Sequence, residues 1–146
     1  MATAAHTIAD PSGLWTLTES RPADLAGLVE SIWYFEGSIP HPRERHFPSG
    51  LAGLVIQLER PFHFVKDGTR ERCPTTCLSG IQTGPTVIEA PTPVSRVLGV
   101  RLTPAGTYMI AGGALCETSG RVVDLGDLVG RAASELAGQC DEAQGA

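Results

Sequence analysis

The sequence contains neither a long apolar run nor a secretory leader. Nowhere do about 18 apolar residues follow one another, the minimum that marks a membrane-spanning helix. Residues 1–10 have neither the basic stretch nor the apolar core of a signal peptide. We therefore expect no membrane contact and no secretion, and predict a cytoplasmic location.

Positive charge is also scarce. The 146 residues contain 11 Lys and Arg against 16 Asp and Glu, a formal net charge of −5. Proteins that bind the phosphate backbone of nucleic acids carry a surplus of basic side chains. The charge balance therefore predicts no direct nucleic-acid contact by this domain.

Cysteine is limited to four residues, Cys73, Cys77, Cys116 and Cys140. Without a signal peptide, we expect them to be free thiols in a reducing compartment. Cys73 and Cys77 form a C-x3-C pair with His63 as the nearest imidazole, but no second Cys or His pair has zinc-ligand spacing. We expect ordinary thiols and no cofactor.

Catalytic motifs are missing as well. Glu30 and Glu36 lie six residues apart on one predicted strand, roughly 20 Å at strand rise, too far for a general acid and base pair. Ser49 stands in a Pro-Ser-Gly turn without the glycines of a nucleophile elbow. The sequence predicts a protein that is not an enzyme.

Glycine and proline are abundant, with 17 Gly and 11 Pro. Such a high frequency of turn-forming residues is typical of many short strands joined by turns. The chain length suits one domain. We expect a flexible start over 1–10, a single domain over 11–140 and a flexible tail over 141–146.

The first two-thirds of the chain is predicted to be mostly β. Pro22 and the spacing of the leucines favour a short helix over 22–29. Asp67-Gly68 predicts a hairpin turn within an antiparallel meander. Apolar and β-branched runs predict strands over 30–36, 51–58, 62–65, 69–72, 77–82, 86–90 and 94–102.

The last third is predicted to be helical. Thr103 is a suitable cap and Pro104 suits a first turn, so a helix should follow the last long strand. A second helix should open at Asp124 or Gly126. Strands first and helices last predict a mainly β fold, an antiparallel barrel or sandwich with short helices at the C-terminal end.

A ligand pocket is predicted from polar or bulky residues that interrupt apolar strands: Trp33, Gln57, His63 and Arg101. Arg101 alternates with Gly99 on one face of its strand, and a small barrel can turn such a face toward a cavity. Its guanidinium matches the geometry of a carboxylate. An internal ion pair and an outward-facing arginine are the alternatives.

A metal-dependent enzyme is the rival hypothesis. His46 and His63, with a third ligand such as His41, could hold a metal in the way cupin barrels do. No two of these histidines have the His-x-His spacing that projects both rings from one strand face. A purely structural, partner-binding domain is a third possibility, favoured if side chains fill the interior.

Three blocks of sequence resemble the N-terminal domain that precedes the helix-turn-helix region of AraC-type bacterial transcription regulators. They are Ile32-Trp-Tyr-Phe35, Phe47-Pro-Ser-Gly50 with Leu54-Val-Ile-Gln-Leu58, and Val97-Leu-Gly-Val-Arg-Leu-Thr-Pro-Ala-Gly106. Thr118 to Glu135 resembles the end of the same domain. Where the family has an acidic residue in the Pro-x-Gly turn, this chain has Ser49.

The resemblance implies a cupin-like β-barrel that senses a small-molecule effector or pairs two subunits. DNA binding would be delegated to a C-terminal pair of helix-turn-helix units, which these residues do not include. From it we expect an effector pocket and a homodimer with its contact surface on the C-terminal helices.

Overall fold

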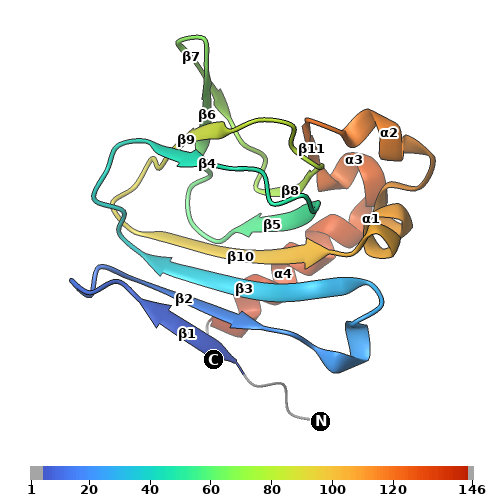
Figure 1. Ribbon diagram of the computed structural model, residues 1–146, viewed down its shortest axis with the longest axis horizontal. Coiled ribbons are helices and arrows are strands. Elements are labelled where there is room, and N and C mark those ends of the chain that lie inside the picture. The colour runs from blue at the N-terminus through green and yellow to red at the C-terminus, as the bar shows by residue number, and fades with distance from the viewer. Residues whose placement is uncertain (1–4, 145–146) are drawn as a thin grey trace.

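The computed structural model describes residues 5–144, and within that range strands form two antiparallel sheets (Figure 1). Sheet A has seven strands in the order β1-β2-β3-β10-β5-β8-β11 and sheet B has four in the order β4-β9-β6-β7. The strands of sheet A are β1 (His6–Ala9), β2 (Trp15–Ser20), β3 (Val29–Gly37), β5 (Gly53–Gln57), β8 (Thr76–Ser79), β10 (Ser95–Leu102) and β11 (Val122–Asp124). Those of sheet B are β4 (Glu44–His46), β6 (His63–Lys66), β7 (Thr69–Arg72) and β9 (Thr86–Glu89).

Helices follow the last long strand; α1, α2 and α3 lie at one end of sheet A, and α4 runs from there behind the sheet (Figure 1). They are α1 (Pro104–Ala111), η2 (Gly112–Ala114), α2 (Leu115–Thr118), α3 (Leu125–Val129) and α4 (Arg131–Gln144). The Thr103 hydroxyl accepts a hydrogen bond from the backbone N–H of Gly106 at 3.1 Å, and Pro104 is the first residue of α1. The predicted cap and start of this helix are confirmed.

The helices cover one face of sheet A. Because strand side chains alternate, β10 turns Val100 and Leu102 to one side and Gly99 and Arg101 to the other. The first side packs against the helices, in a cluster that includes Leu54, Leu78, Leu102, Ala111, Ile110, Leu115 and Leu128. Leu78, Leu102 and Ala111 are buried and the others partly buried; because fully burying a leucine contributes about 1.5–3 kcal/mol, this layer is the main core.

The other face of sheet A is connected to sheet B. The Gln57 side chain, at the end of β5, accepts a hydrogen bond from the backbone N–H of Phe62, just before β6. Cys73, just after β7, lies with its sulfur 3.9 Å from that of Cys77 on β8. These two contacts bring the base of the β6–β7 hairpin against sheet A, on the side away from the helices.

This architecture confirms the predicted fold class at the level of a mainly β, antiparallel two-sheet domain with short helices at its C-terminal end. The predicted hairpin turn is also present. Asp67 and Gly68 have φ values of 50° and 76°, the left-handed backbone that an Asp-Gly pair accommodates in such a turn.

The meander predicted around this hairpin is wrong. β5 pairs with β8 and β10, whereas β6 and β7 belong to the other sheet. Consecutive strands therefore exchange between sheets, and only β6 and β7 are hairpin neighbours in that stretch. Local turn residues specify the hairpin, but they carry no information about which sheet the next strand joins.

The helix predicted over 22–29 reduces to one 3-10 turn, η1 (Ala23–Leu25). Gly27 lowers the helix propensity, and Val29 already begins β3. The carbonyls of Gly27 and Leu28 accept hydrogen bonds from the hydroxyl and backbone N–H of Thr103, at 2.8 and 3.1 Å. These contacts dock residues 27–28 on the β10–α1 junction directly before β3 begins.

The termini differ from the expected flexible segments. His6–Ala9 pairs with Thr16–Glu19 as strand β1, and α4 continues through Asp141 to Gln144. Residues 1–4 and 145–146, which share those predictions, lie outside the described residues. Within residues 5–144, no helix has the length and apolarity needed to cross a membrane.

Candidate functional site

Three of the four predicted site residues share one face of sheet A, the face turned away from the helices. Trp33 on β3 lies opposite Gly99 on β10, and Gln57 on β5 lies opposite Val97. Arg101 is two residues beyond Gly99, so alternation places it on the same face. The order along the sheet is Arg101 at one end, Trp33 in the middle and Gln57 at the other end.

Trp33 and Gly99 are in unusually close contact. A Cβ atom at residue 99 would lie 2.0 Å from two carbons of the Trp33 indole. The ring therefore occupies the space that any other side chain at this position would need. Gly99 lets the indole lie directly on the backbone of β10, where it forms a half-buried aromatic surface.

Arg101 forms an ion pair on this face. Its Nη1 donates to Oε1 of Glu19 on β2 at 2.6 Å and to the hydroxyl of Ser31 on β3 at 3.4 Å. The pair is part-exposed, with side-chain exposures of 42% for Arg101 and 31% for Glu19. The ion pair raised above as an alternative for Arg101 is therefore present, and it leaves the arginine within reach of solvent.

Gln57 is buried and fully occupied by structural contacts. Its Oε1 accepts from the backbone N–H of Phe62 at 2.6 Å, and its Nε2 donates to the carbonyl of Pro74 at 3.0 Å. These two backbone groups lie just before β6 and just after β7. Gln57 thus holds the base of the hairpin, and these two contacts engage both the oxygen and the nitrogen of its amide.

His63 lies apart from the other three predicted site residues. It lies on β6 in sheet B, opposite Glu89 on β9 and Arg72 on β7. The neighbouring residue Phe62 pairs with Cys73, whose sulfur points toward sheet A. Alternation therefore directs His63 away from sheet A.

The histidines named for a metal site do not converge. His46 on β4 lies opposite Thr86 and His63 lies opposite Glu89, three residues further along β9. An odd spacing on one strand means that the two imidazoles project from opposite faces of sheet B. Among residues 5–144, no group of three His, Cys, Asp or Glu side chains is arranged to hold a metal ion.

Cys73 and Cys77 form a buried thiol pair beside Gln57. A hydrogen bond from Cys77 lowers the pKa of the Cys73 thiol, and the same interaction together with burial raises the pKa of Cys77 well above its usual range. The pair therefore titrates as a unit, with the first proton leaving from Cys73.

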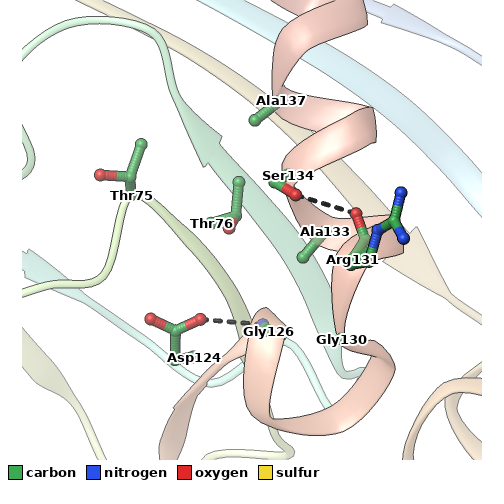
Figure 2. Close-up of a pocket in the computed structure, with 9 residues that line it drawn as sticks. All are labelled: Thr75, Thr76, Asp124, Gly126, Gly130, Arg131, Ala133, Ser134 and Ala137. Carbon is green, nitrogen blue, oxygen red and sulfur yellow. Dashed lines mark hydrogen bonds between the residues drawn. The ribbon is translucent and has the colours of Figure 1, made fainter.

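The described residues also line an open groove of about 460 Å³ between α4 and the chain around β8 (Figure 2). Two of its polar side chains form hydrogen bonds within or at the start of the helices. Asp124 accepts from the backbone N–H of Gly126 at 2.8 Å, and the Ser134 hydroxyl donates to the carbonyl of Arg131 at 2.9 Å. None of the four predicted site residues lines this groove.

Sequence reasoning missed Glu19 and Ser31, which complete the surroundings of Arg101. Trp15 to Ser20 alternates apolar and polar residues, and this pattern predicts the strand that carries Glu19. No local pattern could have paired Glu19 with Arg101, since 82 residues separate them in the chain.

No curated protein matches the sequence. Three solved structures are similar: an HTH_3 family transcriptional regulator from Vibrio cholerae, an Fe(II) form of HppE, and a putative ethanolamine utilization protein Q from Salmonella typhimurium LT2. Their identities are 16%, 11% and 13%, and their TM-scores 0.46, 0.47 and 0.42. At these levels, none bears on the ligand or chemistry of this chain.

The alignments cover 64%, 68% and 70% of this chain and 54%, 56% and 96% of the respective structures. This chain therefore spans about half the length of the first two. A family model for a domain of unknown function, DUF6597, matches residues 20–124, from the end of β2 to the end of β11. Because the match covers most of the chain, the protein belongs to the DUF6597 family.

Proposed function

We propose that this chain is an effector-sensing and dimerisation domain of an AraC-type bacterial transcription regulator, acting in the cytoplasm. In this role it binds a small molecule, performs no catalysis and makes no direct DNA contact. The observation that carries the proposal is the Trp33 indole lying on Gly99, beside the part-exposed Arg101–Glu19 pair. A flat aromatic surface next to a charged group is a usual arrangement in small-molecule sites.

The chemistry of this face favours a ligand with an apolar ring and a carboxylate. Both hydrogen bonds of Arg101 to described residues use Nη1, so Nη2 and Nε remain available for a bidentate contact. The ligand ring would stack on Trp33. Its carboxylate would bind Arg101 alongside Glu19 or displace it.

The non-enzymatic part of the proposal rests on where the reactive side chains lie. His46 and His63 project from opposite faces of sheet B, so the residues named for the metal-dependent rival do not fit a shared metal. The Ser49 hydroxyl accepts from the backbone N–H of Leu51 at 3.3 Å, a turn contact. Among the described residues, the Ser49 hydroxyl is thus hydrogen-bonded to the backbone of Leu51 and to no base.

A fluorescence titration tests the effector site. Trp15→Phe leaves Trp33 as the only tryptophan, since the chain contains two. We expect benzoate to change Trp33 emission in a saturable way, and benzamide to have no effect. Saturable binding that requires the carboxylate supports the proposal.

Arg101→Met should abolish that response, and Arg121→Met is the matched control because Arg121 is exposed and remote from Trp33 in sequence and sheet. Binding that survives Arg101→Met overturns the site assignment. A wider panel of carboxylates with no thermal stabilisation of the protein and no change in emission overturns the sensing role.

The dimerisation part rests on α1. Tyr108 and Met109 are 63% and 68% exposed on this helix, side by side in the sequence. Burying two such side chains against a second copy removes apolar area from water. We place the dimer contact on the C-terminal helices for this reason.

A further inference from the structure

Sheet B presents a cluster of basic residues on the face that points away from sheet A. We call this the arginine face and define it by Arg43, Arg45, Arg70 and Arg72. In the strand register, Arg45 lies opposite Val87, Arg70 opposite Val65 and Arg72 opposite His63, all on one face. Arg43 joins them because its Nε lies 3.5 Å from Oε2 of Glu89.

Charge is segregated between the two faces of sheet B. Glu44 and Glu71, the other acidic residues of these strands, lie opposite Ile88 and Phe64, so they project from the other face. The arginine face therefore carries four arginines and one glutamate, a net charge of 4 − 1 = +3. The whole chain, in contrast, has a formal net charge of −5.

Glu89, the acidic residue on this face, forms long ion pairs with two of the arginines. Oε2 of Glu89 lies 3.5 Å from Nε of Arg43 and 3.4 Å from Nε of Arg70, but neither contact has hydrogen-bond geometry. Arg45 and Arg72 make no ion pair or side-chain hydrogen bond with residues 5–144. All four arginines are exposed. Their guanidinium groups are thus available to a ligand.

The size of the cluster limits what it can bind. Arg45 and Arg70 lie three strand spacings apart, and Arg70 and Arg72 are two positions apart along β7, so the face measures roughly 14 by 7 Å. That area is far smaller than the surface of roughly 600 Å² or more that even a single nucleic-acid-binding module buries. A small ligand with two or more negative groups spans it instead.

We propose that the arginine face is a second binding site, specific for a small multivalent anion that bears phosphoryl or several carboxylate groups. Guanidinium groups bind both kinds of oxyanion bidentately. The site is separate from the Trp33–Arg101 face and goes beyond the function proposed above. A bound anion would neutralise the repulsion among the four arginines, and it would thereby stabilise sheet B.

Isothermal titration with inorganic pyrophosphate and with citrate, at constant ionic strength set by sodium chloride, tests this site. We expect saturable binding of at least one probe, and which of them binds identifies the phosphoryl or the carboxylate class. The double variant Arg45→Gln/Arg72→Gln should bind at least about tenfold more weakly, because two charge-assisted contacts are lost. Arg45→Lys/Arg72→Lys should retain part of the affinity.

Three comparisons make the result decisive. Glu89→Gln should bind the anion more tightly, since it removes the only negative charge on the arginine face. Arg121→Gln and Arg101→Met, each a remote arginine variant, should bind like the wild type. The proposal is overturned if neither probe binds, or if Arg121→Gln weakens binding as much as the double variant does. Arg101→Met separates this site from the effector site, because only the latter depends on that residue.

Discussion

The Trp33 indole occupies the position that a side chain at residue 99 would need, 2.0 Å from an ideal Cβ. A glycine on a central strand costs backbone entropy, so its presence there indicates a close approach by another group. In this protein that group is the aromatic ring at the centre of the candidate site. The shape of the site therefore depends on a residue that contributes no side chain.

Replacing Gly99 with alanine is expected to displace the Trp33 ring and destabilise the fold by about 1–3 kcal/mol, the usual range for overpacking. Thermal unfolding should show a midpoint lower by several degrees. In the Trp15→Phe background, the emission of Trp33 should also shift. Gly84→Ala is the matched control, because a Cβ there meets nothing within 4 Å. Unchanged emission in Gly99→Ala would show that the ring is not held against this strand.

Removing the Arg101–Glu19 pair should cost little stability. Both side chains are part-exposed, so solvent screens the pair and its loss is expected to cost less than about 1 kcal/mol. A double-mutant cycle of Arg101→Met and Glu19→Gln, followed by denaturant unfolding, measures the coupling. A coupling of several kcal/mol would indicate that the pair is structural and not kept for a ligand.

Gln57→Leu should be more damaging. It removes both partners of buried backbone groups, the N–H of Phe62 and the carbonyl of Pro74. Each buried polar group left unpaired costs about 1–3 kcal/mol. Denaturant unfolding should therefore show a loss of about 2 kcal/mol or more. Gln139→Leu, on the exposed side of α4, should stay within about 0.5 kcal/mol of the wild type.

The Cys73–Cys77 pair is expected to form a disulfide under mild oxidation. Hydrogen peroxide would convert one thiol to a sulfenic acid and release water, and the second thiol would then displace another water as the S–S bond forms. Intact mass should fall by two hydrogen atoms, and peptide mapping should place the bond between these residues. Cys73→Ser should abolish this product.

The rate of that oxidation should rise with pH. The pKa of Cys73 lies below its usual value because Cys77 donates a hydrogen bond to it, so the reactive thiolate appears at a lower pH than in an ordinary cysteine. Exposed Cys116 serves as the internal reference. If Cys116 reacts first at every pH, burial outweighs the hydrogen bond.

A charged substitution on α1 tests the dimer contact. Tyr108→Glu/Met109→Glu should convert a dimer to a monomer in light scattering at tens of micromolar protein, because two negative charges would be buried at the contact. Both side chains are exposed within the chain, so its own folding should be unaffected. A wild-type monomer at that concentration would contradict the dimerisation role.

Much of the secondary structure was predictable because its determinants are local. Thr103 and Pro104 specify the start of α1, and Asp67-Gly68 specifies a hairpin turn through backbone preferences alone. Strand alternation also placed Arg101 and Gly99 on one face correctly. Predictions failed where the observed chain takes another local path, as at residues 27–28, whose carbonyls bind Thr103 directly before β3 begins.

The candidate site was predictable only in part. The strand patterns singled out Trp33 and Arg101, whereas the roles of Gln57 and His63 depend on neighbours that lie far away in the sequence. Gln57 binds the backbone at residues 62 and 74, and His63 belongs to the opposite sheet. Hydrogen-bond partners of this kind are set by packing and leave no periodic trace in the sequence.

The sequence by itself determined a mainly β chain with C-terminal helices, because hydrophobic periodicity, caps and turn residues act over a few positions. The tertiary structure alone decided which strands are neighbours, that Glu19 meets Arg101 across 82 residues, and that four arginines from two separate segments share one face. The reason is physical: long-range pairing is selected by the packing of whole sheets, and no short stretch of residues encodes it.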